Sequence, residues 1–237
     1  MNILITRPEE EAKELQQLIL NNTNYNALLF PVLKIIPLAK KNIPKATIVI
    51  FISHNAVKNS KYLFNKINFD KTKIAAIGIK TKKELQKNNI NVDISPKNEF
   101  STEGLLKEMN GIDFNQEDIL IVRGKGGREK LRNKLINKGA KVNYLEVYER
   151  TPMELKNEYK ENLCSFLTSN SGIIIITSID VLTFFANMIK KLDIPINNLT
   201  KYKILTLSNR IKNKAYSIGF HNVEVISNIN SFFKTNN

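Results

Sequence analysis

Apolar runs of four to six residues recur along the chain, and most precede a segment in which apolar residues return every three or four positions. Residues 47–52 (TIVIFI) and 119–122 (ILIV) form such runs, which are typical of strands buried on both faces of a parallel sheet. After the first strand, Ala12, Leu15, Leu18 and Ile19 form the buried stripe of a predicted helix. Because strands and helices alternate, the pattern predicts an α/β fold.

The stretch 119–150 contains a complete strand–helix–strand unit. Its first strand is followed by a glycine-rich turn at 123–127 and then by a helix, which we expect to end at Gly139 in a left-handed C-cap. A second strand is predicted over 142–147, and Tyr148 follows it. Such units are the building blocks of parallel sheets.

The order of predicted elements occurs twice in the chain, as an internal duplication. The corresponding segments are 3–7 with 119–123, 51–57 with 176–181, and 73–94 with 203–226. The last pair includes a predicted short strand at 92–94 that matches one at 223–226. Two similar parallel-sheet domains follow from this repetition.

Two proline-flanked segments indicate where the chain crosses between these domains. Pro31 and Pro37 bracket a predicted extended connector. Pro152 and the polar run 153–159 indicate a second crossing.

The crossings predict one discontinuous domain and one inserted domain. The preferred division is 1–36 plus 150–237, an insertion at 40–147, and connectors at 37–39 and 148–149. A simple division near residue 115 is the alternative. Either way, a ligand is expected in a cleft between the domains, beyond the carboxyl ends of the strands.

Cysteine and histidine are scarce, which limits the chemistry of the chain. Cys164 is the only cysteine, so an intramolecular disulfide and a cysteine metal cluster are excluded. His54 and His221 are the only histidines, which argues against a histidine-based metal site. We find no apolar run long enough to span a membrane and no secretory signal at the N-terminus. We therefore expect a cytoplasmic protein without a metal.

The chain is strongly basic, with 36 Lys and Arg against 22 Asp and Glu and a formal net charge of +14. Such an excess favours the capture of anionic partners. Lys, Asn and Ile are all frequent, however, and a composition bias spread over solvated surfaces explains the charge equally well. Charge alone is therefore weak evidence of function.

Small or anion-binding residues follow the predicted strands in both repeats. They are Arg7, Ser53, Gly78 with Thr81, Arg123 with Gly124, and Ser178. Helix N-termini offer free backbone N–H groups to anions, and hydroxyl side chains add donors. Alternatively, Ser53, Thr81 and Ser178 are ordinary helix N-caps. Their recurrence at matching points of both repeats favours a ligand with several carboxylates.

Other catalytic signals are few. The turn at 123–128 lacks the spacing of both the phosphate-binding loop and the dinucleotide fingerprint. His54, beside Ser53, is a candidate acid or base or else an exposed loop residue. Tyr148 ends a strand near the second crossing, so its hydroxyl is a candidate proton donor. A tyrosine that packs the hinge is the equal alternative.

A succession of short motifs along the whole chain resembles the uroporphyrinogen-III synthase family of tetrapyrrole biosynthesis. The motifs are LITRP (4–8), FISHNAV (51–57), AAIG (75–78) with Thr81, FSTEGL (100–105), RG (123–124) with GRE (127–129), VYER (147–150) and TS (177–178). Each is unspecific by itself, but their order is specific.

The resemblance implies two flavodoxin-like α/β domains joined by two crossing strands, the first made of both chain ends. It also implies a cofactor-free lyase that acts on hydroxymethylbilane, a linear tetrapyrrole with eight carboxylates. The reaction expels the terminal hydroxyl, inverts the last pyrrole ring through a spiro intermediate and closes the macrocycle. Spontaneous closure gives the uninverted type I isomer. We further expect a monomer that binds neither nucleic acid nor membrane, with a transient hand-over of substrate from the preceding enzyme of the pathway.

Carried over residue by residue, the resemblance maps the family's candidate proton donor, a tyrosine, onto Tyr148. It also implicates Ser53, Thr81 and Ser178 in binding or activity. The segment 207–212 departs from the family, since Ser208 and Ile211 replace a glycine and a threonine, and Asp180 places an acid near the supposed polyanion site. The alternative is a non-catalytic homologue, or a basic two-domain module that binds another polyanion or nucleic acid.

Overall fold

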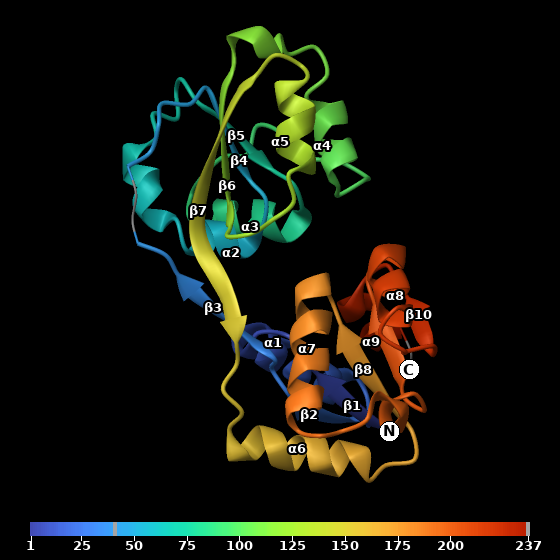
Figure 1. Cartoon of the computed structure of the whole chain (residues 1–237). Helices are drawn as coiled ribbons and strands as arrows, with labels where there is room; N and C mark the ends of the chain where they lie inside the picture. Colours follow the sequence, from blue (N-terminus) through green and yellow to red (C-terminus); the bar gives the residue numbers. More distant parts are fainter. Residues whose placement is uncertain (40–41, 236–237) are drawn as a thin grey trace. The chain divides into compact units, whose positions relative to one another are not determined.

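The computed structural model describes residues 1–39 and 42–235 and divides into two compact units (Figure 1). The first unit comprises Met1–Lys34 and Thr151–Asn237, and the second comprises Ile35–Arg150. The predicted domain ranges also contain residues 40–41 and 236–237, which lie outside the described residues. No helix in the described part of the chain is long and apolar enough to cross a membrane.

The first unit contains a five-stranded parallel sheet in the order β2-β1-β8-β9-β10. Its strands are β1 (Asn2–Ile5), β2 (Asn26–Leu29), β8 (Gly172–Ile176), β9 (Lys203–Thr206) and β10 (Val223–Val225). Numbered along the chain, this order is 2-1-3-4-5, which is the doubly wound arrangement of flavodoxin-like sheets.

Helices cover the first sheet because each carries one apolar face. They are α1 (Glu9–Asn22), α6 (Asn157–Leu167), α7 (Ile179–Lys191), α8 (Asn209–Tyr216) and α9 (Ile229–Thr235), with the short 3₁₀ helix η3 (Ile196–Leu199). In α6, the buried residues Tyr159, Leu163 and Phe166 recur at helical spacing. The polar crossing predicted at 153–159 is therefore wrong at its end, because this stripe starts a helix at Asn157.

Glu9 lies in the first turn of α1 and gives the helix an electrostatic contribution to stability. Its carboxylate accepts hydrogen bonds from Lys13 Nζ at 2.8 Å and Lys156 Nζ at 3.2 Å. The hydrogen bond from Lys13 is the largest cause that lowers the pKa of Glu9 from 4.5 to about 2. Because the folded-state pKa lies below the unfolded-state value, the stabilisation is present above pH 4.5 and is lost as pH falls towards 2.

We expect Glu9→Gln to lower the free energy of unfolding at pH 7 by about 0.5–1 kcal/mol. The loss should be smaller at pH 3, where the unfolded state of the wild-type chain already binds the proton. Urea unfolding at both pH values measures it, with Glu14→Gln on the exposed face of α1 as the control. An equal loss at pH 7 and pH 3 would contradict the assignment.

The second unit contains a five-stranded sheet in the order β3-β7-β6-β4-β5, in which β7, β6, β4 and β5 pair in parallel. Its strands are β3 (Leu33–Pro37), β4 (Ile48–Phe51), β5 (Lys73–Ala76), β6 (Asp118–Gly124) and β7 (Lys141–Pro152). The strand predicted at 92–94 is only an isolated parallel bridge between Ile94 and Ala75. It stops there because Pro96 has no N–H to continue a ladder.

Apolar side chains on both faces of the second sheet are buried, as its unbroken apolar runs predict. Val49, Leu120 and Leu145 pack on one face with residues of α2 (His54–Lys58) and α3 (Ile79–Lys87). Ile50 and Ile121 pack on the other face with residues of α4 (Thr102–Glu108) and α5 (Lys130–Ile136). Two 3₁₀ helices complete the unit, η1 (Lys61–Lys66) and η2 (Phe114–Gln116). Gly139 has φ +98°, as expected for the predicted left-handed C-cap after α5.

Strand β7 is longer than predicted, and the connector predicted at 148–149 lies within it. The strand continues to Pro152 because β3 pairs along its other edge, where Leu38 N donates to Val147 O at 3.0 Å. Pro37, the first residue of the other predicted connector, is likewise the last residue of β3. Residues 35–36 and 150, predicted in the first domain, belong to the second unit.

The strand registers confirm that the two domains are similar. Ile3 in the centre of the first sheet pairs with Ile173, and Ile119 pairs in the same way with Ile48. The strand after each partner also starts in the same register, Lys203 opposite Ile173 and Lys73 opposite Ile48. The second unit follows the same spatial order with its last two strands, β6 and β7, in the places of β1 and β2. Equivalent positions are therefore Arg7 and Arg123, Ser178 and Ser53, Ser208 and Gly78, Ile211 and Thr81, and Tyr202 and Thr72.

Candidate active site

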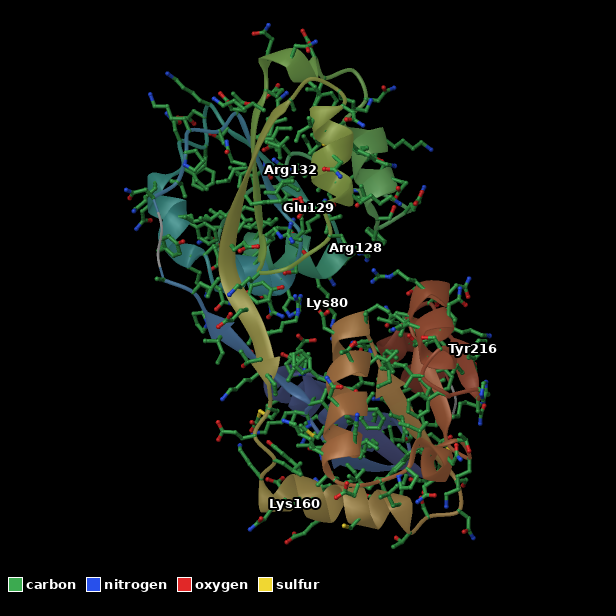
Figure 2. All side chains as sticks on the ribbon, viewed as in Figure 1. Lys80, Arg128, Glu129, Arg132, Lys160 and Tyr216 are labelled. Atoms are coloured by element: carbon green, nitrogen blue, oxygen red, sulfur yellow. The ribbon has the colours of Figure 1, made fainter. Side chains whose placement is uncertain are left out.

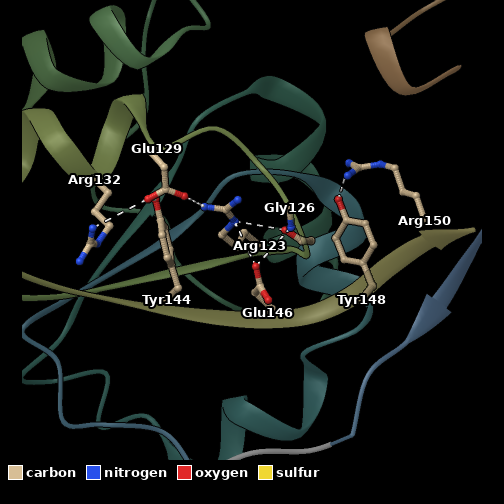
Figure 3. Close-up of polar contacts among 9 residues, drawn as sticks. Arg123, Gly126, Glu129, Arg132, Tyr144, Glu146, Tyr148 and Arg150 are labelled. Atoms are coloured by element: carbon tan, nitrogen blue, oxygen red, sulfur yellow. Dashed lines mark hydrogen bonds and ion pairs between the residues drawn. The ribbon is translucent and has the colours of Figure 1, made fainter. Parts of the chain in front are cut away.

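Five of the predicted site residues lie in the second unit, where β4 and β6 end and where Tyr148, within β7, pairs with Gly124. Figure 3 shows polar contacts of two of them, Arg123 and Tyr148. The five are Ser53, His54, Arg123, Gly124 and Tyr148. They lie together because parallel strands expose their carboxyl ends at one edge of the sheet.

Arg123 is buried, with 1% of its surface exposed, and its charge is paired within the protein. Its Nη1 donates to Glu129 Oε1 at 3.2 Å, and its Nε lies 3.9 Å from Glu146 Oε1. The guanidinium also lies 4.2 Å from the ring centroid of Tyr144. A buried cation requires such partners. This geometry favours a structural role for Arg123 at the turn over direct contact with a substrate carboxylate.

Close packing or a positive φ explains the glycines at the end of β6 and in the turn that follows. A Cβ at Gly124 would lie 2.5 Å from Tyr148 Cζ, and one at Gly127 would lie 2.7 Å from Arg123 Nη2. Gly126 has φ +73°, a conformation that favours glycine, and its N–H donates to Glu146 Oε1 at 3.3 Å. The turn thus holds a tyrosine ring and a guanidinium, and it does not form a nucleotide loop.

A shift in strand register turns the Tyr148 side chain towards α2. Arg123 pairs with Glu146, but the next residue, Gly124, pairs with Tyr148, so that β7 contains one extra residue here. Alternation alone would place Tyr148 on the face of Tyr144 and Glu146. With the extra residue, Tyr148 joins the opposite core together with Val147.

The Tyr148 hydroxyl belongs to a small polar network. Arg150 Nη2 donates to it at 2.8 Å, and Ser53 Oγ lies at 3.1 Å, where either oxygen can donate. A guanidinium only donates hydrogen bonds, so the phenol oxygen is the acceptor from Arg150. When Ser53 also donates, the phenol proton points at neither neighbour and is available to a ligand. The side chain of Tyr148 is 1% exposed.

Ser53 has two roles in this network. It is the N-cap of α2, and its Oγ accepts a hydrogen bond from Ala56 N at 3.0 Å. The ordinary N-cap interpretation is therefore correct for Ser53, but the contact with Tyr148 adds a second function for the same oxygen. His54 is the first residue of α2 and is half-buried beside it.

Gly78 and Thr81 begin the helix that follows β5. Gly78 is the N-cap of α3, with no side-chain hydrogen bond to the first turn and no described atom within 4 Å of a Cβ built on it. The backbone N–H groups of this turn therefore have no capping side chain in the described structure. Thr81, in the same turn, is 4% exposed.

The predicted residues of the first unit also lie at strand ends. Arg7 pairs with Glu11, while its buried Nε has no hydrogen-bond partner among the described residues. Ser178 caps α7 and accepts from Val181 N at 3.1 Å. Asp180 lies in the first turn of the same helix.

Segment 207–212, which departs from the family pattern, still contains the start of a helix. It has a serine at the position where the family has a glycine. Ser208 caps α8 with its own side chain, which accepts from Ile211 N at 3.4 Å. Ile211 is 3% exposed and belongs to the core. This helix start thus differs from its equivalent in the second unit, where Gly78 and Thr81 stand.

Four residues of the site were not predicted as site residues: Glu129, Tyr144, Glu146 and Arg150, although Glu129 and Arg150 lie within the motifs GRE and VYER. Tyr144 donates to Glu129 Oε2 at 3.0 Å, which orders the carboxylate that pairs with Arg123. Figure 2 places Glu129 with Arg128 and Arg132 along the turn and helix that follow β6. Alternation of polar residues at 144, 146, 148 and 150 was a signal that could have revealed part of this network.

No group of three or more His, Cys, Asp or Glu side chains in residues 1–39 and 42–235 is placed to hold a metal ion.

Comparison with known proteins gives one consistent family. The model of the family described as uroporphyrinogen-III synthase HemD matches residues 13–230. A putative uroporphyrinogen-III synthase of Methanocaldococcus jannaschii is 30% identical over 188 residues, which cover 75% of this chain and 74% of that protein. A uroporphyrinogen-III synthase of Chlorobaculum parvum is 26% identical over 168 residues, which cover 65% and 66% of the two chains.

Solved structures have the same fold. A uroporphyrinogen-III synthetase of Helicobacter pylori aligns over 96% of this chain and 93% of its own, with TM-score 0.62 and 16% identity. A mutant uroporphyrinogen III synthase of Thermus thermophilus aligns over 99% and 96%, with TM-score 0.59 and 14% identity. Because the family model covers most of the chain, the chain belongs to the uroporphyrinogen-III synthase family.

Proposed function

We propose that the chain closes hydroxymethylbilane to uroporphyrinogen III, with loss of water and inversion of the last pyrrole ring. Membership of the family supports this reaction. The observation that carries the catalytic part is the position of the Tyr148 hydroxyl, between Ser53 Oγ at 3.1 Å and Arg150 Nη2 at 2.8 Å. A hydroxyl held by two polar neighbours is suited to proton transfer.

In this proposal Tyr148 donates its proton to the terminal hydroxyl of the substrate. The carbon–oxygen bond breaks, water leaves, and the electrons of the pyrrole ring stabilise the azafulvene cation that results. The last ring then attacks through its already substituted carbon, forming the spiro intermediate. A proton released later in the reaction restores the phenol. Arg150 lies where negative charge develops on the phenol oxygen and stabilises it.

Substrate must gain access to this buried hydroxyl. Arg150 is half-buried, and its guanidinium carbon lies 5.0 Å from the ring centroid of Tyr148. A substrate carboxylate that pairs with this guanidinium would draw it off the face of the ring, while Nη2 keeps its hydrogen bond to the phenol oxygen.

Several groups are proposed to bind the carboxylates of the substrate. In the second unit these are the uncapped start of α3 at Gly78, with Thr81, and the start of α2 at Ser53 and His54. In the first unit they are Arg7 and Ser178. Arg123 and Gly124 are proposed to act indirectly, because they fix the turn against which Tyr148 packs. A substrate cleft between the two domains stays a prediction.

The experiment is incubation of the chain with hydroxymethylbilane, followed by oxidation and separation of the porphyrin isomers. We expect the type III isomer with the folded chain and the type I isomer with heat-denatured chain. Equal isomer ratios in both samples would exclude synthase activity.

A non-catalytic homologue that binds a polyanion is the second candidate. The observation in its favour is the altered start of α8, where Ser208 caps the helix and Ile211 is buried. It predicts that hydroxymethylbilane binds to the chain and still closes to the type I isomer. For a non-catalytic homologue, the double variant Ser208→Gly and Ile211→Thr should still give only the type I isomer. For a synthase, the same variant should give type III in an equal or higher yield than the wild-type chain.

A further inference from the structure

A hollow of about 610 Å³ opens in the second unit at the amino ends of β4 and β6. The candidate active site lies beyond the carboxyl ends of the same strands, so the hollow is separate from it. Its accessible apolar lining is formed by Ile43, Ala46 and Ile67, which are half-buried and pack against the core residues Val49, Leu63 and Leu120 behind them. Small-molecule sites have volumes of about 300–1,000 Å³ and mostly apolar walls.

Three lysines line the hollow, Lys45, Lys66 and Lys71. All three are exposed, and none forms an ion pair within the described part of the chain. The one acidic residue in the lining, Asp118, lies 3.5 Å from Lys141 Nζ, which is outside the hollow. The hollow therefore combines an apolar floor with an excess of positive charge at its edge, and this favours an organic anion.

The first unit shows that the fold does not require this hollow. Tyr202 is equivalent to Thr72, which lines the hollow in the second unit. Tyr202 is 1% exposed, its ring lies 4.4 Å from that of Phe166, and its hydroxyl donates to the carbonyls of Leu167 and Ser169 at 3.0 Å. In the second unit, Thr72 only donates to Ala46 O at 3.1 Å and leaves the space open.

The lysines differ between the units in the same way. Lys201 is equivalent to Lys71, but its Nζ donates to Ser169 O at 3.0 Å and lies 4.9 Å from the Tyr202 ring. A hollow of about 470 Å³ remains beside it, lined by Leu167, Lys201, the loop residues 193–195, and Asn197 and Asn198 of η3. Its described lining contains no strand residue. Only the second unit therefore opens onto its sheet at this place.

We propose that the hollow of the second unit is a separate binding site for a small organic anion with an aromatic or aliphatic body. The body packs against Ile43, Ala46 and Ile67, the half-buried apolar side chains of the lining, and the anionic group faces Lys66 and Lys71. This site is additional to the proposed synthase activity and does not depend on it.

Titration of the full folded chain with 8-anilinonaphthalene-1-sulfonate tests the proposal by fluorescence. We expect saturable binding of one dye per chain. Thr72→Tyr, which introduces the side chain that fills the equivalent place in the first unit, should weaken binding by about tenfold or more. The double charge reversal of Lys66→Glu and Lys71→Glu should weaken it by a similar factor. Lys160→Glu, on α6 (Figure 2), is the matched control and should leave binding unchanged.

Three results would overturn the proposal. One is the absence of saturable binding, and another is binding that neither Thr72→Tyr nor the lysine reversals change. The third is binding that Tyr148→Phe abolishes while the hollow variants do not, which would place the dye in the candidate active site. Circular dichroism checks that each variant is folded, and if Thr72→Tyr is not, the lysine reversals decide. The isomer assay tests the proposed synthase activity, and its result does not depend on whether the dye binds to the hollow.

Discussion

Tyr148→Phe is expected to lower kcat for the closure of hydroxymethylbilane by about 10²–10⁴-fold, the usual contribution of a general acid. The ring and its packing against Gly124 remain, and only the hydroxyl between Ser53 and Arg150 is lost. We expect the free energy of unfolding to fall by no more than about 1 kcal/mol, since one polar network loses its central member. KM should change little, because the proposed mechanism assigns carboxylate binding to groups other than the Tyr148 hydroxyl.

The matched control is Tyr202→Phe in the first unit. It also removes a buried tyrosine hydroxyl that donates to backbone carbonyls, but at a place remote in sequence from the candidate site. We expect a comparable loss of stability and an unchanged kcat. If Tyr148→Phe behaves like this control, Tyr148 packs the core and does not donate a proton.

Gly124→Ala is expected to lower the free energy of unfolding by about 1–3 kcal/mol, as overpacking does. The added Cβ would lie 2.5 Å from Tyr148 Cζ, so the ring must move. Movement of the ring also separates its hydroxyl from Ser53, and we therefore expect kcat to fall together with stability. Urea unfolding and the isomer assay measure the two effects.

Two further variants establish the cause. Gly78→Ala should change stability by less than about 0.5 kcal/mol, since no described atom lies within 4 Å of the new Cβ. In a Tyr148→Ala background, Gly124→Ala should cost much less than in the wild-type chain, because the ring that it meets is absent. If Gly124→Ala lowers the free energy of unfolding equally in that background, the strain arises in the backbone and not from contact with Tyr148.

The fold was predictable because its sheets are buried on both faces. Unbroken apolar runs such as 119–122 permit few other structures, and their repetition along the chain revealed two similar sheets. Shorter elements depended on local chemistry that the apolar pattern does not contain. At 92–94 a single bridge replaced a strand because Pro96 follows, and β7 extended past Tyr148 because a second strand pairs with its edge.

The sequence predicted where in the sheet the site residues lie, but it did not predict most of their contacts. Arg123 ends a strand as expected, but Glu129 and Glu146 pair with it, and neither is adjacent in sequence. The contact of Tyr148 with Ser53 depends on one extra residue in β7. A register shift of this kind leaves no mark in the alternation of polar and apolar residues, and so the sequence could not reveal it.

The central claim, that this chain directs closure of hydroxymethylbilane through Tyr148, is tested most directly by one measurement. It is the fraction of type III isomer formed at increasing concentrations of the wild-type chain and of Tyr148→Phe. Catalysed closure competes with spontaneous closure, so the fraction should rise with the wild-type chain until type III predominates. The curve for Tyr148→Phe should be displaced to concentrations about 10²-fold higher or more. A wild-type fraction that stays at the enzyme-free value, or two coincident curves, would contradict the account.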